Sequence, residues 1–140
     1  VVPASFSTGA AVSETGDHFE SVDLITRNDG STAVFVPTAG SSFNDVHVFG
    51  QNGASFGGGF WSYNDTGCGT GQITFEKLVV TGAGTGISWN CPATTVSVKD
   101  SKFLGVDASL DVTNGANVSV TNALIENAEG PPIRLFNSAN

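Results

Sequence analysis

The sequence of 140 residues predicts a single-domain right-handed parallel β-helix, an all-β solenoid of about five coils. Three observations carry this prediction: a six-residue pattern that recurs along the chain, an apolar motif that follows each copy of it, and the composition. Hydrophobic residues make up 39% of the chain and charged residues only 13%, which is typical of a chain with a packed core. Most bulky apolar residues are Val, Phe, Ile and Leu, and the first three favour strands.

The six-residue pattern reads apolar, polar, polar, apolar or small, variable, apolar. Its copies are Phe19–Leu24, Phe43–Val48, Phe75–Val80, Val98–Phe103 and Val120–Ile125. Apolar residues at positions one, four and six do not follow the period of a helix. Two short strands joined by a bend explain them, with the polar pair of positions two and three at the bend. The pattern therefore predicts one part of a repeated β-helical coil.

A second apolar motif completes each coil as a further strand. Its copies are Val34–Val36, Phe60–Ser62, Ile87–Trp89, Leu110–Val112 and Ile133–Leu135. Coils stacked about 4.8 Å apart bring equivalent residues into columns. We expect three inward columns, formed by the first and last residues of the six-residue pattern and by the first residue of the second motif. A sandwich of hairpins is the alternative, but Asp29-Gly30 and Asn52-Gly53 fall one coil period apart, which is too long for a hairpin.

The domain boundaries follow from these repeats. Residues 1–17 form a lead-in or cap, and residues 18–140 form the coils. One interval between copies is longer than the others and contains a Gly-rich, aromatic insertion at residues 50–72. Long loops on a rigid scaffold often carry function.

The two cysteines favour a disulfide between neighbouring coils. Cys68 and Cys91 precede Phe75 and Val98 by the same number of residues, so the same turn of adjacent coils holds both. A bridge across a loop of this length stabilises a protein by roughly 3 kcal/mol in the entropic model. No Cys/His cluster accompanies them, so we expect no metal site there.

Charge and chain features bear on partners and location. Thirteen acidic and five basic residues give a formal net charge of -8, which argues against a nucleic-acid partner. No apolar run is long enough to span a membrane. The missing Met, the cysteine pair and two sequons, at Asn64 and Asn117, favour a secreted, extracellular glycoprotein.

The polar pairs at the bend are expected to stack into two ladders. One ladder is Glu20, Asn44, Glu76, Lys99 and Thr121, and the other is Ser21, Asp45, Lys77, Asp100 and Asn122. A carboxylate site for a cation is one interpretation. Charges of alternating sign favour the other, a solvated ladder of ion pairs worth under about 1 kcal/mol each.

The second motif predicts an outward row of candidate site residues. Its members are Phe35, Trp61, Ser88, Asp111 and Arg134, flanked by Tyr63, Asn90, Thr113 and Phe136. Exposed Trp and Tyr side chains stack on the apolar faces of sugars, and Asp and Arg hydrogen-bond hydroxyls or carboxylates. Alternatively, the Gly-rich insertion folds over Trp61 and Tyr63 and buries them, and Asp111 simply pairs with Arg134.

The coil pattern of residues 18–137 resembles the pectate-lyase-like superfamily of right-handed β-helices. The resemblance rests on coil periodicity and not on a catalytic signature. It implies activity on polysaccharides. In the lyases of this superfamily an Arg or Lys removes the proton next to a uronate carboxylate, with Ca²⁺ as a possible cofactor. On that basis Arg134 is the residue to test as a base, with Asp111 as its acidic neighbour.

Two functions from different classes follow. The first is a secreted β-helix that binds or degrades a polysaccharide, with Trp61, Tyr63, Phe35, Ser88 and Asn90 contacting the substrate; if it is an enzyme, it is lyase-like. The second is a non-catalytic extracellular module for wall-surface binding, elicitor-like interaction or end-to-end assembly. The last coil has no segment after it that could cap it, so we expect either homo-oligomerisation through that open C-terminal coil or a continuation removed by processing.

Overall fold

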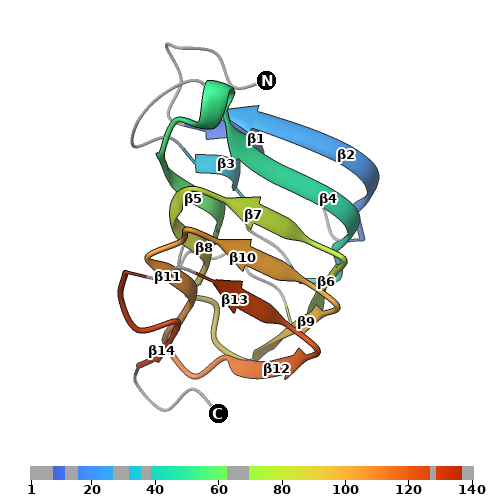
Figure 1. Cartoon of the computed structure of the whole chain (residues 1–140). Coiled ribbons are helices and arrows are strands. Elements are labelled where there is room, and N and C mark those ends of the chain that lie inside the picture. The colour runs from blue at the N-terminus through green and yellow to red at the C-terminus, as the bar shows by residue number, and fades with distance from the viewer. Residues whose placement is uncertain are drawn as a thin grey trace.

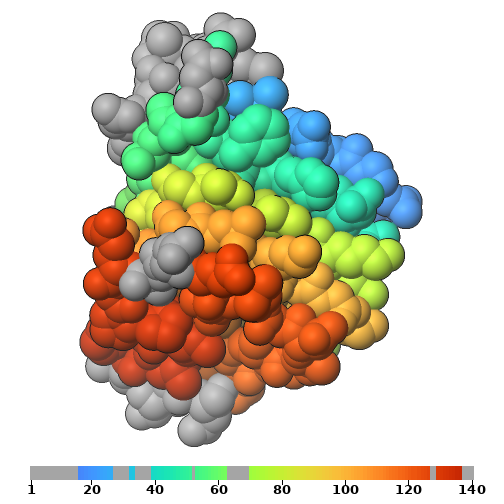
Figure 2. All heavy atoms as spheres, in the orientation of Figure 1, coloured from blue at the N-terminus to red at the C-terminus, as the bar shows by residue number. Residues whose placement is uncertain are grey.

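The computed structural model describes residues 8–11, 16–26, 32–35, 39–62, 70–126 and 129–136. These residues form a parallel β-solenoid, which confirms the predicted fold class. The strands stack from the N-terminal end of the solenoid to its C-terminal end (Figure 1), and Figure 2 shows the layers as successive bands of colour. Within the described chain no helix is long and apolar enough to cross a membrane.

Sheet A is six-stranded and forms one side of the solenoid. Its strands, in spatial order, are β1 (Thr8–Ala11), β3 (Thr32–Phe35), β5 (Phe56–Trp61), β8 (Ala83–Trp89), β11 (Ala108–Val112) and β14 (Ile133–Leu135). All pairs are parallel and in register. The predicted column of the second motif is in register, because its backbone positions pair in succession, namely Val34, Phe60, Ile87, Leu110 and Ile133. The side chains of Phe60, Ile87 and Leu110 are buried in the core.

Sheet B is eight-stranded and bends to form the other two sides. It starts with two long strands, β2 (His18–Thr26) and β4 (Ser42–Gly50). Each later layer has two short strands, namely β6 (Gly71–Glu76) with β7 (Val79–Thr81), β9 (Thr94–Lys99) with β10 (Lys102–Leu104), and β12 (Asn117–Thr121) with β13 (Leu124–Glu126). The solenoid has about four turns, close to the about five coils that the sequence predicted.

The bend of sheet B lies where the polar pairs predicted it. The third residue of every repeat has a positive φ, between 50 and 54°, at Ser21, Asp45, Lys77, Asp100 and Asn122. This left-handed conformation breaks the alternation of the strand, so that the next residue points inward as well. Val46, Leu78 and Ser101 follow their bend residues and are all buried.

Aromatic residues fill the N-terminal half of the core. The ring of Phe43 stacks on those of Phe19 and Phe75, with centroids 4.9 and 5.2 Å apart. Phe60 of sheet A meets Phe43 and Phe75 edge-on, at 4.9 and 4.8 Å. Such pairs stabilise beyond their buried area by roughly 0.5–1.5 kcal/mol each. The first predicted column therefore joins sheet A to sheet B.

Glycines let the two sheets approach in the middle of the solenoid. A Cβ on Gly86 of β8 would lie 2.6 Å from the carbonyl oxygen of Ser109 and 2.7 Å from the ring of Phe103. Phe103 belongs to β10 and is fully buried. Gly86 thus makes room for the largest residue of the second inward column.

The long second coil adds residues at two places. In the third coil, Gly82 is followed directly by Ala83. In the second coil, five extra residues, 51–55, separate Gly50 from Phe56, which is the register partner of Ala83. These extra residues include the short 3₁₀ helix η1 (Gln51–Gly53). The remaining extra length lies between Trp61 and Gly71, where residues 63–69 are outside the described part. The predicted insertion at 50–72 therefore includes strand β5 itself.

The last layer lies at the C-terminal end of the solenoid (Figure 1) and keeps its predicted inward residues partly in solvent. Its exposed large apolar residues are Val120, Leu124, Ile133, Leu135 and Phe136. Each earlier layer is covered by the next one, but the described residues provide no layer beyond β12, β13 and β14.

Candidate functional site

The outward row of sheet A brings together residues that are far apart in the sequence. Four of its residues pair in succession across neighbouring strands, namely Trp61 of β5, Ser88 of β8, Asp111 of β11 and Arg134 of β14. Trp61 is 44% exposed, and the other three side chains are partly exposed. The insertion therefore does not bury Trp61 as a satellite core. Phe35 is the backbone register partner of Trp61 at the N-terminal side of the row.

A groove lies against Trp61 on this face. It has a volume of about 220 Å³ and is lined by Thr32, Gly57, Gly58, Phe60, Trp61, Thr85 and Ser88. Gly58 gives it depth, because a Cβ there would lie 3.6 Å from Thr32 Oγ1, so any side chain would fill the space between Thr32 and Thr85. An apolar ring thus stands beside three hydroxyl groups, those of Thr32, Thr85 and Ser88.

A larger hollow shares the lining residue Gly57 with this groove. It has a volume of about 640 Å³ and is lined by Ser55, Phe56, Gly57, Gly82, Ala83, Gly84, Gly105, Asp107 and Glu129. Ser55 belongs to the extra residues of the second coil, which therefore form one wall. Asp107 and Glu129 are both exposed and supply the charged side chains of the lining. We call the two connected hollows the sheet A groove.

Asp111 and Arg134 do not form the ion pair that one reading of the sequence expected. They are register partners, but no salt bridge joins them, and Asp111 Oδ1 is buried without a hydrogen-bond partner. The Arg134 side chain turns toward Gly130, where a Cβ would lie 2.9 Å from Arg134 Nη2. The guanidinium therefore lies beside the backbone that follows Glu129, at the edge of the sheet A groove.

Calcium has no fitting set of ligands in the described residues. Within them no three His, Cys, Asp or Glu side chains come together in a way that could hold a metal ion. Ca²⁺ prefers six to eight oxygen ligands, usually several of them carboxylates. We therefore derive no chemical step through calcium.

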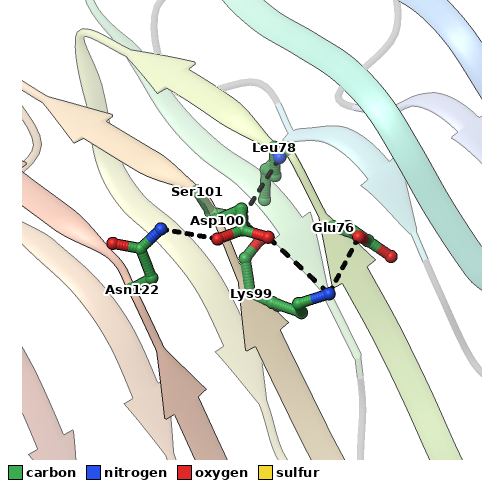
Figure 3. Close-up of polar contacts among 6 residues, drawn as sticks. All are labelled: Glu76, Leu78, Lys99, Asp100, Ser101 and Asn122. Atoms are coloured by element: carbon green, nitrogen blue, oxygen red, sulfur yellow. Dashed lines mark hydrogen bonds and ion pairs between the residues drawn. The ribbon is translucent and has the colours of Figure 1, made fainter.

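The bend of sheet B carries a ladder of hydrogen bonds and ion pairs and not a cation site (Figure 3). Lys99 Nζ lies 3.2 Å from Glu76 Oε1 and 3.7 Å from Asp100 Oδ2. Asn122 Nδ2 donates to Asp100 Oδ1 at 2.6 Å, and Ser21 Oγ donates to Asp45 Oδ2 at 2.9 Å. The carboxylates of Glu76 and Asp100 raise the pKa of Lys99. Lys77 forms no ion pair with Asp45 or Asp100, unlike the prediction.

His47 lies next to this ladder. Its Nδ1 is 3.3 Å from Asp23 Oδ1 and its Nε2 is 3.8 Å from Asp45 Oδ1. All three side chains are exposed, so solvent screens these contacts and they contribute little to stability.

Several predicted residues fall outside the described part of the chain or at its edge. Tyr63, Asn64 and Cys68 lie outside it. Cys91 is fully buried, and Asn117 is exposed at the start of β12. The backbone N–H of Asn90 donates to Ser62 Oγ at 2.8 Å, and its side chain is partly exposed beyond the outward row.

Two buried polar networks could not be predicted from the repeat pattern. Ser101 Oγ donates to the carbonyl of Lys99 at 2.7 Å and accepts from the N–H of Leu78 at 3.1 Å (Figure 3). Trp89 Nε1 donates to Thr94 Oγ1 at 2.7 Å, and Thr94 Oγ1 donates to the Cys91 carbonyl at 2.6 Å. Asp107 and Glu129 were also missed. The one feature of the sequence that could have indicated these two residues is that each lies a few residues before a second-motif strand.

Comparison with known proteins adds no relative. No family model, no curated protein and no solved structure matches the chain.

Proposed function

We propose that the protein binds a polysaccharide in the sheet A groove. The observation that carries the proposal is the position of Trp61, which is 44% exposed and lines a groove together with Thr32, Thr85 and Ser88. An indole presents a flat apolar face, and sugars offer apolar C–H faces with hydroxyls around the rim. Threonine and serine hydroxyls both donate and accept hydrogen bonds, which suits those hydroxyls.

The stacked coils supply the rigidity that such a site needs. Trp61 is held in β5 between the parallel partners β3 and β8, and Phe60 beside it is anchored in the aromatic core. A binding surface on rigid strands loses little conformational entropy when a ligand arrives. An extended glycan fits a groove that continues past Gly57 into the larger hollow.

Cleavage is the catalytic form of this proposal, with Arg134 as base and Asp111 beside it. Arg134 lies at the edge of the sheet A groove, next to Gly130, and no ion pair fixes its guanidinium to Asp111. The geometry supports binding better than uronan β-elimination, because the described residues offer no carboxylate cluster for a metal. Binding is therefore the proposed function, and a uronate-release assay tests for cleavage.

We further propose that the protein works outside the cell, with a disulfide between Cys68 and Cys91 and glycans on Asn64 and Asn117. Three observations support this proposal. Cys91 is fully buried, and the described chain has no free cysteine. Asn117 is exposed in β12 and precedes Val118 and Ser119, so its amide is accessible for glycosylation.

A glycan array with purified protein tests the proposal. We expect Trp61→Ala to lower affinity for any bound glycan by roughly tenfold, the loss of one stacking contact. Leu124→Ala is the matched control, because Leu124 is equally exposed, at 44%, but lies in β13 of sheet B. Equal losses in both variants, or no bound glycan, would overturn the proposal. Release of unsaturated uronate that stops in Arg134→Ala would show that the protein is a lyase.

The exposed last layer favours a second candidate function, end-to-end assembly with another copy of the chain. All but one of the exposed large apolar side chains are in this layer, and Trp61 is the exception within the described residues. The strands β12, β13 and β14 present the same in-register surface that every earlier layer uses for stacking. Sedimentation tests it: we expect dimers that Leu124→Asp with Leu135→Asp converts to monomers. Monomers of the unmodified chain would overturn this candidate.

A further inference from the structure

The sheet A groove is acidic. Asp107 and Glu129 line its larger hollow, and none of the described residues that line either hollow is a lysine or an arginine. A third hollow, of about 400 Å³, adjoins it at Gly82, and its titratable lining residue is His47. Within the described chain, no lysine or arginine therefore faces a ligand from the linings of these hollows.

The described cations are placed elsewhere. Lys77, Lys99 and Lys102 cluster at the bend of sheet B, where Lys99 is already engaged by Glu76 and Asp100. Arg134 is the one cation near the groove in the described chain, and it lies over Gly130 at the edge. The carboxylates of Asp107 and Glu129 outnumber the guanidinium of Arg134, so the described groups give the groove a negative charge. The formal net charge of -8 makes the electrostatic potential of the whole protein negative as well.

The two carboxylates lie on successive layers of the solenoid. Asp107 precedes β11 and Glu129 precedes β14, and the N–H of Gly130 donates to the carbonyl of Asp107 at 3.2 Å. Layers of a parallel sheet repeat about every 4.8 Å, which is close to the length of one sugar unit. A chain of sugars that stacks on Trp61 and crosses the sheet obliquely past Gly57 into the larger hollow would therefore meet Asp107 and Glu129.

We propose that the glycan bound is a cationic amino-polysaccharide, with unacetylated amino sugars, and not a uronan. This inference rests on the proposed function, which supplies the sugar-stacking site. An ammonium group on the sugar donates charge-assisted hydrogen bonds to Asp107 and Glu129. A uronan would bring its carboxylates against the same two residues, and like charges in contact oppose binding.

Calorimetric titration with three soluble probes tests the inference: oligomers of glucosamine, of N-acetylglucosamine and of galacturonate. The measurements are made at about pH 5.5, where ordinary carboxylates are ionised and the sugar amines are protonated. We expect the glucosamine oligomer to bind roughly tenfold more tightly than the acetylated one, from two partly screened charge pairs. We expect the galacturonate oligomer to bind most weakly.

Two double variants separate local from general charge effects. Asp107→Asn with Glu129→Gln should remove the preference for the glucosamine oligomer and leave binding of the acetylated oligomer unchanged. Glu20→Gln with Glu126→Gln removes the same charge from exposed sites on β2 and β13 and should keep the preference. Raising the ionic strength from about 0.01 to 0.15 M shortens the screening length from about 30 to 8 Å and should reduce the preference.

The outcomes distinguish this inference from the proposed function. Equal binding of the glucosamine and acetylated oligomers, with both weakened by Trp61→Ala, overturns the amino-glycan inference and leaves glycan binding in place. Tighter binding of the galacturonate oligomer also overturns it. No binding of any oligomer overturns both, and a preference that survives in Asp107→Asn with Glu129→Gln overturns the assignment to these residues.

Discussion

Asp111 and Arg134 are register partners on β11 and β14, yet Asp111 Oδ1 is buried without any hydrogen-bond partner. Opposite charges in adjacent strands usually pair, and a buried carboxylate oxygen usually has a donor. Arg134 instead turns toward Gly130. The sheet therefore tolerates an unfavourable carboxylate at this position.

Asp111→Asn tests this relationship. The amide keeps the size of the side chain and removes the charge, so we expect the free energy of unfolding to rise by up to about 1 kcal/mol. Urea denaturation at neutral pH measures it. Arg134→Gln serves as the companion variant and should change stability by less than about 0.5 kcal/mol. If both variants lowered the free energy of unfolding by more than about 0.5 kcal/mol, the two residues would have to pair in solution.

Ser101 fills an inward position that Val46 and Leu78 fill in the two preceding layers of sheet B. Its hydroxyl satisfies the buried N–H of Leu78, so Ser101→Ala leaves that donor without a partner. We expect a loss of about 1–3 kcal/mol in urea denaturation. Thr121→Ala, at an exposed position of β12, is the control and should stay within about 0.5 kcal/mol. Equal stability of both variants would mean that the Leu78 N–H finds another acceptor.

The course of the coil could be predicted because it depends on local pattern. A polar pair between inward residues marks the bend, and the bend residues Asp45, Asp100 and Asn122 are of the types that best tolerate a positive φ. Register follows, since a shift by one residue would turn every inward side chain outward.

The candidate site could be predicted only in part. The row from Trp61 to Arg134 follows from strand alternation, but the groove beside it depends on Gly57 and Gly58, whose missing side chains no periodicity identifies. Asp107 and Glu129 lie in turns before their strands, and turn geometry decides that they face the same hollow. The absence of an Asp111–Arg134 pair depends on the rotamer of Arg134, which the pattern does not encode.

Gly86 tests the close approach of the two sheets. Gly86→Ala would place a methyl group 2.6 Å from the Ser109 carbonyl oxygen, so backbone or the Phe103 ring has to move. Overpacking of this kind costs about 1–3 kcal/mol, which thermal or urea denaturation resolves. Gly58→Ala is the control in the same sheet, because its nearest contact would be an ordinary 3.6 Å. The packing argument fails if both variants are equally stable.

Lys77 holds a positive φ of 53° without the side chain best suited to it. Asparagine reaches the left-handed region more easily than lysine does. We expect Lys77→Asn to raise the free energy of unfolding by about 0.5–1 kcal/mol. Lys102→Asn, in an extended strand of the same face, should give no gain. A gain in both variants would point to removal of positive charge and not to the backbone.

We expect a disulfide between Cys68 and Cys91. Cys91 is fully buried next to the Trp89–Thr94 hydrogen bond, so a bridge there would fasten a well-packed turn to the preceding coil. We expect the intact chain to be lighter by two hydrogens than its reduced form. We also expect Cys68→Ser to lower stability by roughly 3 kcal/mol in urea, through the entropy of the unfolded chain. Adding a reductant should destabilise the unmodified protein by a similar amount and leave Cys68→Ser unchanged. A protein that reacts with a thiol reagent at both cysteines after unfolding without reductant has no such bridge.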